Sequence, residues 1–362
     1  MKIITTVGTS LISNSPEDCS NLESENFAAL KFEPENTFFK THIKPKEEAL
    51  FKSIGNSTAS AELASLTKID PDGQADIYLL CTETVTSYMC GRILQRHLGE
   101  RSKVQYVEGL QVKVLDDFKK RGVPNLLTAI EKIAQGGHYW DDVVLNVTGG
   151  YKAIIPIMTI IGQIKRLPTF YIFKGEDDRQ YELIEIPKMP VDYQTDVFET
   201  YWETFSRFGT VGEELQEKQA LINEFLTACE GFLEVADDMV TLNPVGKILW
   251  WNYQQQYFFL NTTDNIWSEI QGQEDIKRIL ETKLHNTEIR SKKTERKQDH
   301  YVFDDGNNNN RIYYFEDQGR VYVYKTFQNE EKAKAYINTP FDNVKRADFV
   351  RESMPFRIPI KR

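Results

Sequence analysis

The chain has 362 residues, of which 40% are apolar and 27% are charged, so it is long enough for two or three packed domains and too apolar for general disorder. Its four cysteines form no CxxC pair and its five histidines have no ligand spacing, so neither a zinc site nor a disulfide framework is indicated, and a reducing cytosol fits best. No run of about 18 apolar residues occurs, which argues against a signal peptide or a membrane span.

The net charge of −10 is unevenly distributed. From His285 to the end there are 16 Lys and Arg against 12 Asp and Glu, a balance of +4, which leaves 28 basic against 42 acidic residues, or −14, in the remainder. An acidic body with a basic tail indicates that only the tail meets a polyanion such as RNA. A solvated charged surface with chance clustering is the alternative interpretation.

Short β-branched runs alternate with helical patterns in the first half of the chain. The runs are KIITTV (2–7), DIYLLC (76–81), KVQYVE (103–108), DVVLNV (142–147) and TFYIF (169–173). Between them, VTSYMCGRILQRHL, VPNLLTAIEKIAQGG and KAIIPIMTIIGQI carry apolar residues at spacings of three and four. This alternation predicts an α/β domain over residues 1–190 with a mainly parallel, doubly wound sheet, which holds ligands outside the carboxyl ends of its strands.

A boundary and a connector follow. Prolines in IEIPKMPVDYQTD (184–196) interrupt the pattern near residue 190, and VFETYWETFSRFG then has a helical pattern. Within 216–251, a helix ends at Gly231, the strands FLEV and MVTL flank the turn ADD, and NPVGKIL begins another helix. Residues 191–250 are therefore predicted to be a winged-helix-like connector.

Residues 251–362 are predicted to form a small α+β domain with an antiparallel sheet. In it, EIRSKKTERKQ (288–298) reads as a basic helix, and residues 300–327 read as two or three strands with turns at 306–310 and 317–319. The asparagine tract 307–310 suits a loop, and NEEKAKAYINT (329–339) has the pattern of a short helix.

Three turns fall at the carboxyl ends of predicted strands and should line one edge of the sheet. They are Gly8-Thr9-Ser10, Thr82-Glu83-Thr84 and Thr148-Gly149-Gly150-Tyr151-Lys152. Glycines let backbone amides approach a ligand, a helix expected to begin near Tyr151 directs its amino end there, and Lys152 adds a positive charge. We therefore predict a phosphate-binding site, although such turns also serve as packing devices.

The motif TTVGTSL at the start, followed about 140 residues later by NVTGGYKA, resembles the CARF domain of CRISPR-associated effectors. The resemblance covers roughly residues 1–190 and implies a Rossmann-like sensor of cyclic oligoadenylate, with the cyclic tetra-adenylate favoured, that works as a homodimer. It further implies that the ligand is held by residues of the three turns and the strand before the last: Gly8, Thr9, Ser10, Thr82, Glu83, Thr84, Asn146, Thr148, Gly149, Gly150, Tyr151 and Lys152.

The segment RIYYFEDQGRVYVYKTFQNEEKAKAYINT (311–339) resembles the closing hairpin and helix of RelE-like toxins. This weaker resemblance spans about 110 residues from Trp250 and implies a ribosome-dependent endoribonuclease that cuts messenger RNA. The whole chain is similar to the CRISPR-associated mRNA interferases that join CARF, a winged-helix linker and RelE.

Metal-independent RNA cleavage by the 2′-hydroxyl needs a group that removes that proton, cations at the phosphorane and a group that protonates the leaving 5′-oxygen. Candidate catalytic residues are Arg311, Lys325, Lys332, Lys334, Tyr336 and His300, with Arg311 the firmest. Candidate contacts to ribosomal RNA are Lys292, Lys293, Arg296 and Lys297. Solvated helices, a packed Tyr336 and a surface His300 are the alternative interpretations.

Other outputs remain open. A HEPN ribonuclease, which is entirely helical, needs Arg and His at short spacing, as in Arg92 to His97 or Arg278 to His285. A metal nuclease is suggested only weakly by Glu330 and Lys332. A ligand-controlled transcription regulator would read DNA with the connector. The connector has no Lys or Arg between 221 and Lys247, which argues against contacts to DNA phosphates there.

Overall fold

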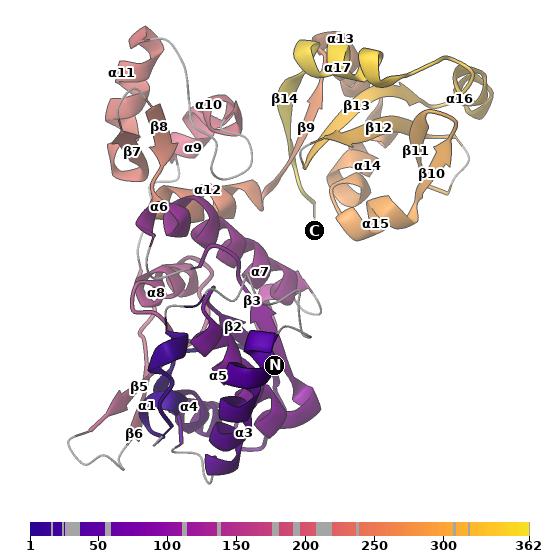
Figure 1. Ribbon diagram of the computed structural model, residues 1–362. Coiled ribbons are helices and arrows are strands. Elements are labelled where there is room, and N and C mark those ends of the chain that lie inside the picture. Colours follow the sequence, from indigo (N-terminus) through magenta and orange to yellow (C-terminus); the bar gives the residue numbers. More distant parts are fainter. Residues whose placement is uncertain are drawn as a thin grey trace. The chain divides into compact units, whose positions relative to one another are not determined.

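A computed structural model gives the structure of the chain, which divides into two compact units (Figure 1). Unit 1 comprises Met1–Tyr193 and Cys229–Leu249, and unit 2 comprises Gln194–Ala228 and Trp250–Arg362. The structure describes residues 1–15, 17–23, 25, 37–54, 59–110, 114–135, 139–175, 181–190, 196–207, 219–236, 239–306, 309–317 and 319–361. Parts of several predicted segments lie outside these residues: 136–137, 191–195, 208–209, 216–218, 237–238, 307–308 and 318.

Unit 1 is built on a six-stranded sheet of order β3-β2-β1-β4-β5-β6. The strands are β1 Lys2–Thr6, β2 Asp76–Cys81, β3 Ser102–Tyr106, β4 Val143–Asn146, β5 Thr169–Lys174 and β6 Tyr181–Glu185. The first five are parallel to their neighbours, and β6 is antiparallel to β5. The α/β class and the five predicted strands are confirmed, and β6 is a strand that the sequence analysis missed.

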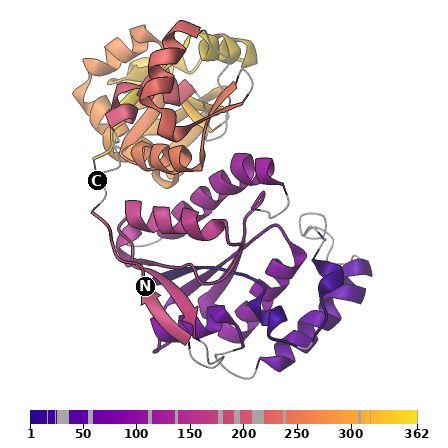
Figure 2. The same ribbon diagram turned by 90° about the vertical axis from the view of Figure 1, so that its left-hand side faces the viewer.

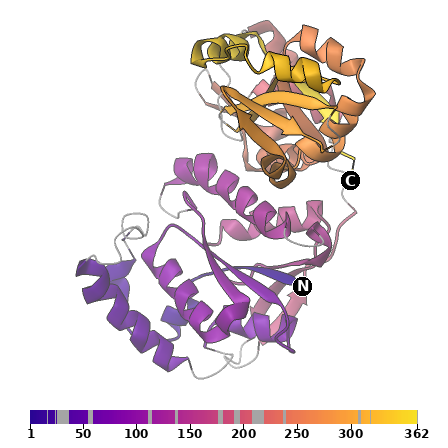
Figure 3. The ribbon, with the colours of Figure 1, turned by 90° about the vertical axis from the view of Figure 1, so that its right-hand side faces the viewer.

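Helices cover both faces of this sheet, as Figures 2 and 3 show from two sides. The helices are α1 Ser10–Ser13, α3 Lys44–Ser53, α4 Ala61–Ile69, α5 Val85–Leu98, α6 Leu115–Asp117, α7 Val123–Gln135 and α8 Ile154–Ile164. On one face, α3, α4 and α5 bury Leu50, Leu63 and Ile93 in a common core with Ile3 and Leu79 of the central strands. Because both faces are covered, β1 and β4 are buried along their whole length.

A small hairpin belongs to unit 1 as well. It pairs β7 Leu233–Ala236 with β8 Met239–Leu242 and leads into α12 Pro244–Gln254. The two strands and the helix match the prediction, and 237–238 of the predicted turn lie outside the described residues. Lys247 of α12 is buried and donates a hydrogen bond to the Lys119 carbonyl oxygen at 2.8 Å. The first positively charged residue of the helix that would read DNA is therefore bound inside the protein and does not face DNA. This weakens the interpretation of the chain as a transcription regulator.

Unit 2 contains a second six-stranded sheet of order β10-β11-β12-β13-β9-β14. The strands are β9 Tyr257–Thr262, β10 Thr294–Lys297, β11 His300–Asp304, β12 Arg311–Asp317, β13 Arg320–Phe327 and β14 Met354–Pro359. All neighbours are antiparallel except β13 and β9, which are parallel. A sheet of this size is incompatible with an entirely helical HEPN domain in unit 2.

Two hydrophobic layers lie on the faces of this second sheet. The helices are α13 Asp264–Gln271, α14 Glu274–Ile279, α15 Thr287–Lys292, α16 Glu330–Tyr336 and α17 Asn343–Glu352. On one face, Ile270 of α13 and Ile276 of α14 pack against Ile312 and Val323. On the other face lies an aromatic layer, which packs against α16 and α17 and consists of Tyr313, Phe315, Tyr322, Tyr324, Phe327, Tyr336, Phe341 and Phe349.

The remaining part of unit 2 is an aromatic cluster on its amino-terminal helices, α9 Asp196–Thr200, α10 Trp202–Arg207 and α11 Gln219–Ala228. Phe198 and Phe205 are fully buried and lie against Trp250, with ring centroids 5.7 and 5.2 Å from it. These contacts join the helices before the hairpin to the part of α12 that follows it. Such aromatic pairs add specific geometry to the burial of apolar surface.

Two predicted helices differ in the structure. The helix expected over 288–298 ends at Lys292, and Thr294–Lys297 forms the edge strand β10. Pairing with β11 over four residues outweighs the helix propensity of Glu, Arg and Lys in a stretch this short. The helix expected near Tyr151 begins at Ile154, after a turn.

Candidate functional site

The three predicted turns lie at one edge of the first sheet. They follow β1, β2 and β4, which are parallel and adjacent in the order β2-β1-β4, so their carboxyl ends meet. The strand that follows β1 in the chain, β2, lies on one side of β1 in the sheet, and β4 lies on its other side. The strand order therefore reverses between β1 and β4, which makes this gap the topological switch point. The predicted ligand residues are thus gathered where open α/β sheets bind ligands.

The turns after β1 and β4 approach each other very closely. A Cβ atom on Gly8 would lie 2.6 Å from the Gly150 backbone nitrogen, and the Thr6 hydroxyl donates a hydrogen bond to the Gly149 carbonyl oxygen. Gly150 has φ +94°, where a Cβ would also come within 3.0 Å of the Thr6 Cβ. These glycines are required for packing of the two turns, independently of any ligand.

Glu62, which the sequence analysis did not select, lies between these turns. It belongs to the first turn of α4, is 1% exposed, and accepts hydrogen bonds from the Gly8 amide and the Ser10 hydroxyl, each at 2.7 Å. A Cβ on Gly149 would lie 2.1 Å from the Glu62 Oε1. Two donors predicted to face a ligand are therefore bound by a carboxylate of the protein itself.

Asn146 and Thr148 hold the β4 turn in place. The Asn146 amide is fully buried and donates to the Thr5 and Ser65 hydroxyls at 2.9 and 2.7 Å. Its Oδ1 accepts from the Thr148 hydroxyl at 2.6 Å, and the Thr148 oxygen accepts from the Ile172 amide at 3.0 Å. Both side chains thus fix the conformation of the turn through hydrogen bonds within the protein and do not present their polar groups to a ligand.

The turn after β2 is bound within the protein. Glu83 is 5% exposed and accepts hydrogen bonds from the Tyr106 hydroxyl at 3.0 Å and the Gly109 amide at 2.9 Å. Burial, followed by the Glu83 charge, raises the pKa of Tyr106, so this hydroxyl remains a donor. Thr82 is also buried, and the Thr84 hydroxyl accepts a hydrogen bond from the Ser87 amide at the start of α5. This turn supports the edge of the sheet from the side of β3.

The outer rim of the switch point is accessible. Thr9, Tyr151 and Lys152 are exposed, and Gly150 and Ser10 are half-buried. Lys152 forms no ion pair within the described part of the chain. The residue before α8, Ala153, provides no side-chain cap for this 11-residue helix. The Ile154 amide donates to the Tyr151 carbonyl oxygen at 2.8 Å and Pro156 has no N–H, so the Ile155 amide is the first-turn donor without a partner among the described residues. A positive side chain and a helix amino end thus face the same rim.

Arg311 in unit 2 lies at the start of β12 and is 5% exposed. Its guanidinium pairs with Asp304 at 2.9 Å, approaches Glu330 at 4.0 Å and donates to the Asn310 carbonyl oxygen at 2.9 Å. Asp304 was not selected from the sequence and Glu330 was named only as a weak metal-nuclease candidate, since nothing in the pattern indicates which carboxylates fold against one arginine.

His300 is buried in the aromatic layer, rather than at the surface. Its Nε2 lies 2.8 Å from the Thr339 carbonyl oxygen and its Nδ1 lies 2.7 Å from the Tyr324 hydroxyl. Because a carbonyl oxygen only accepts, Nε2 must donate, and in the neutral ring Nδ1 accepts from Tyr324. Both ring nitrogens are thus engaged, and the ring is 0% exposed.

Tyr336 is half-buried beside this histidine. Its ring lies edge-on to Tyr313 with centroids 5.2 Å apart and lies 5.6 Å from His300. Burial raises the pKa of its hydroxyl, which favours the protonated form. Within the described residues, this hydroxyl has no hydrogen-bond partner.

The three candidate lysines are separated. Lys334 on α16 pairs with Glu330 at 2.9 Å, and Lys332 on the same helix is exposed. Lys325 on β13 pairs with Glu269 of α13 at 3.0 Å, and α13 packs on the other face of the sheet. The structure therefore groups Arg311, Tyr336 and the two α16 lysines on one side and places Lys325 on the other.

The candidate RNA contacts lie at the edge of the second sheet. Three of the four have partners: Lys292 with Glu288, Lys293 with the Asp305 carbonyl oxygen, and Lys297 with Glu295. Lys292 and Arg296 are exposed. Charged side chains on an edge strand also prevent association of sheets, so this stretch has a structural explanation besides nucleic-acid binding.

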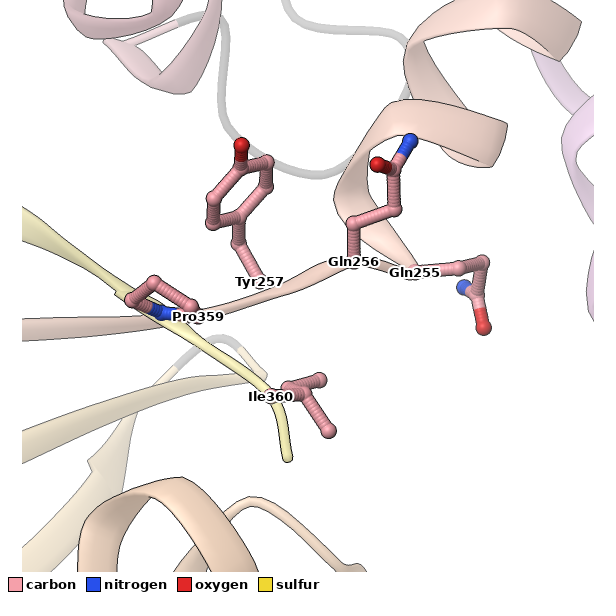
Figure 4. A pocket seen from close by; sticks show the side chains of 5 residues that line it. All are labelled: Gln255, Gln256, Tyr257, Pro359 and Ile360. Atoms are coloured by element: carbon pink, nitrogen blue, oxygen red, sulfur yellow. The ribbon is translucent and has the colours of Figure 1, made fainter. Parts of the chain in front are cut away.

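A shallow pocket lies in unit 2, where β9 begins and β14 ends (Figure 4). It has a volume of about 400 Å³ and is lined by Gln255, Gln256, Tyr257, Pro359 and Ile360. In the figure the side chains of Gln256 and Tyr257 point to one side of the strands and those of Gln255 and Ile360 to the other. They do not converge on one point.

Within the described ranges, no three His, Cys, Asp or Glu side chains are placed to hold a metal ion. A search of the same ranges finds no helix with the length and apolar character needed to cross a bilayer.

One family matches the chain over residues 57–189, under the description CRISPR-associated protein (Cas_APE2256). The matched segment lies in unit 1 and includes α4, β2 to β6 and the turns after β2 and β4, but not β1. No curated protein matches the chain. Over this segment the chain is similar to CRISPR-associated proteins, which supports a CRISPR-related role.

Proposed function

We propose that the chain is a CRISPR-associated effector in which unit 1 binds a cyclic oligoadenylate and unit 2 cleaves messenger RNA on the ribosome. The observation that carries the proposal is the exposed rim of Tyr151 and Lys152 beside the amino end of α8, at the switch point and inside the segment that matches the CRISPR-associated family. The motifs TTVGTSL and NVTGGYKA, which resemble CARF, form the two turns that meet there.

The rim suits a nucleotide with several phosphates. Lys152 supplies a full charge, the Ile155 amide in the first turn of α8 supplies a donor, and the exposed Tyr151 ring offers a surface on which a base can stack. A cyclic tetra-adenylate has twofold symmetry, so a homodimer would present the same rim to each half of the ring. We therefore propose cyclic tetra-adenylate as the ligand and a second copy of this chain as the partner.

Unit 2 carries groups that suit metal-independent RNA cleavage. Tyr336 retains its proton because burial raises its pKa, so it can protonate the leaving 5′-oxygen, while the 2′-hydroxyl proton passes to a solvent water and Lys332 stabilises charge on the phosphorane. Arg311 serves this role only if a phosphate competes with Asp304 and Glu330 for its guanidinium. The engaged ring of His300 makes it a structural residue in this proposal.

The proposal is tested in two steps. Calorimetry with cyclic tetra-adenylate, and with linear tetra-adenylate as control, should show binding of the ring alone. A translation extract with and without the ring should then show cuts in translated messages, mapped by primer extension. Cuts in naked RNA would favour a nuclease that acts without the ribosome, and firm binding of operator-like DNA without cuts would favour a transcription regulator.

A further inference from the structure

The carboxylate of Glu62 occupies the inner end of the proposed anion site. Its two oxygens accept one hydrogen bond each, from the Gly8 amide and the Ser10 hydroxyl, both at 2.7 Å. The Ser10 oxygen in turn accepts from the Ala61 amide at 3.1 Å. A Cβ on Gly149 would clash with Glu62 at 2.1 Å, so the β4 turn closes over this side chain. These donors are the kind that would otherwise bind a phosphate oxygen.

This carboxylate lacks a charged partner. Within the described part of the chain, Glu62 forms no ion pair, although it is 1% exposed. A carboxylate without a charged partner therefore lies against Gly8, Ser10 and Gly149, the residues next to Thr9 and Gly150 of the rim, in surroundings where water screens charge poorly.

We infer that Glu62 is a specificity-determining residue of this site, because it takes the place of a phosphate at the inner donors and repels a second one. This inference rests on the proposed nucleotide site. With the inner donors occupied, a phosphate of the ligand is held only at the outer rim, where Lys152 and the Ile155 amide offset the repulsion. A small free anion gains too little binding free energy at the outer rim, so only a larger ligand that makes several contacts binds.

The role of the charge can be separated from the role of the shape. In Glu62→Gln the amide oxygen can still accept from the Gly8 amide, and the new NH₂ group can donate to the Ser10 oxygen, which has a free lone pair. The geometry of the turn is then kept and the negative charge is lost. The exposed Glu100 provides a matched control as Glu100→Gln.

The test uses inorganic phosphate as the probe, titrated into full-length protein and followed by ³¹P line broadening. Glu62→Gln should bind phosphate about tenfold more tightly than the wild type, as expected when one like charge next to the binding site is removed. The gain should disappear in Glu62→Gln combined with Lys152→Ala, and Glu100→Gln should behave like the wild type. An unchanged or weaker phosphate affinity in a folded Glu62→Gln protein would overturn the inference.

A second variant covers the case in which Glu62→Gln folds poorly. Glu62→Ala removes the charge and opens space at the same donors, so phosphate should raise its melting temperature by more than it raises that of the wild type. Equal shifts would also overturn the inference. Because neither experiment involves cyclic tetra-adenylate, failure of the wild type to bind that ring would count against the proposed function alone.

Discussion

Arg311 and Asp304 face each other across β12 and β11 as a directly opposed pair, with the guanidinium Nη2 and the carboxylate Oδ2 2.9 Å apart. The Arg311 side chain is 6% exposed, whereas Asp304 is 23% exposed. The strongest catalytic candidate of the sequence is thus also a buried member of an ion pair that joins two strands. A loss of activity on its removal would have two explanations unless stability is measured as well.

We expect Arg311→Ala to lower the free energy of unfolding by about 3 kcal/mol, because breaking a buried pair leaves an unbalanced charge. Urea denaturation followed by tryptophan fluorescence measures this. The variant should also lose messenger cleavage with the ring still bound. Arg311→Lys retains the charge and serves as control. Full activity and wild-type stability of this variant would show that Arg311 contributes only its positive charge. Full activity in Arg311→Ala would discard the RNA-cleavage assignment of this residue.

Strands β1 to β5 of the first sheet and β11 to β13 of the second could be predicted because their signals are local, whereas β6, β9 and β14 were not predicted. KIITTV and VYVYKTF carry the β-branched and aromatic composition of strands, and the turns that bound them contain glycine. The α/β alternation predicted a mainly parallel sheet, so the gathering of the Gly8 and Gly150 turns at one edge was predictable, but the strand order was not predicted. The strand β10 was not predictable, because TERK is polar and becomes a strand only by pairing with β11.

The interior of the candidate site could not be predicted for a different reason. Glu62 lies 54 residues after Gly8, and its carboxylate reaches the Gly8 amide only once α4 has packed on the sheet. Ser60 at the amino end of α4, whose hydroxyl accepts from the Leu63 amide, was the one local signal that a helix begins there. No spacing rule links a helix start to a distant glycine turn, and the same holds for Asp304 and Glu330 around Arg311.

Tyr336→Phe should abolish or strongly reduce cleavage without loss of stability. The hydroxyl has no hydrogen-bond partner within the described residues, so its removal leaves no buried group unsatisfied, while the ring keeps its contacts with Tyr313 and Phe327. Cleavage rates and melting temperature are measured on the same preparation. Lys277→Ala on α14, a half-buried lysine that pairs with the exposed Glu274, is a control for changes of charge at the surface. Normal cleavage by Tyr336→Phe would remove this residue from the mechanism.

His300 should affect stability rather than chemistry. Tyr324→Phe removes the donor to its Nδ1 and should lower the free energy of unfolding by about 1 to 3 kcal/mol, since a buried acceptor is left unsatisfied. The pH profile of cleavage should retain the shape of the wild type. A pH profile that changes in Tyr324→Phe would instead place His300 in the proton transfer.

Lys152→Ala should weaken binding of cyclic tetra-adenylate by about tenfold and reduce the salt dependence of binding by about one ion per site. Lys68→Ala is the matched control, because Lys68 is an exposed lysine in the last turn of α4, which leads to the amino ends of the strands. Calorimetry at two salt concentrations measures both quantities. Gly150→Val is a poorer test, because a β-branched residue at φ +94° strains the turn itself. Equal affinities of Lys152→Ala and Lys68→Ala would remove the anion-site argument.

Glu47 gives a test by pH that is independent of any ligand. It lies on α3, pairs with Arg92 of α5 at 3.2 Å, and has a buried Oε2 without a hydrogen-bond partner. Burial raises its pKa above the ordinary 4.5, and Arg92 opposes this only in part. The folded protein therefore binds this proton more tightly than the unfolded chain, so the contribution of Glu47 to stability is greatest below the unfolded pKa and falls as the pH rises through the folded pKa.

Glu47→Gln lacks this charge, so at pH 7 its melting temperature should exceed that of the wild type. The difference should vanish below about pH 4.5, where Glu47 is protonated in both states. Arg92 is 42% exposed, so water solvates its charge when the carboxylate is gone. Glu48→Gln, which removes the exposed partner of Arg96, should change stability by no more than about 0.5 kcal/mol at any pH. A lower melting temperature of Glu47→Gln at pH 7 would show that the pair with Arg92 outweighs the cost of burial.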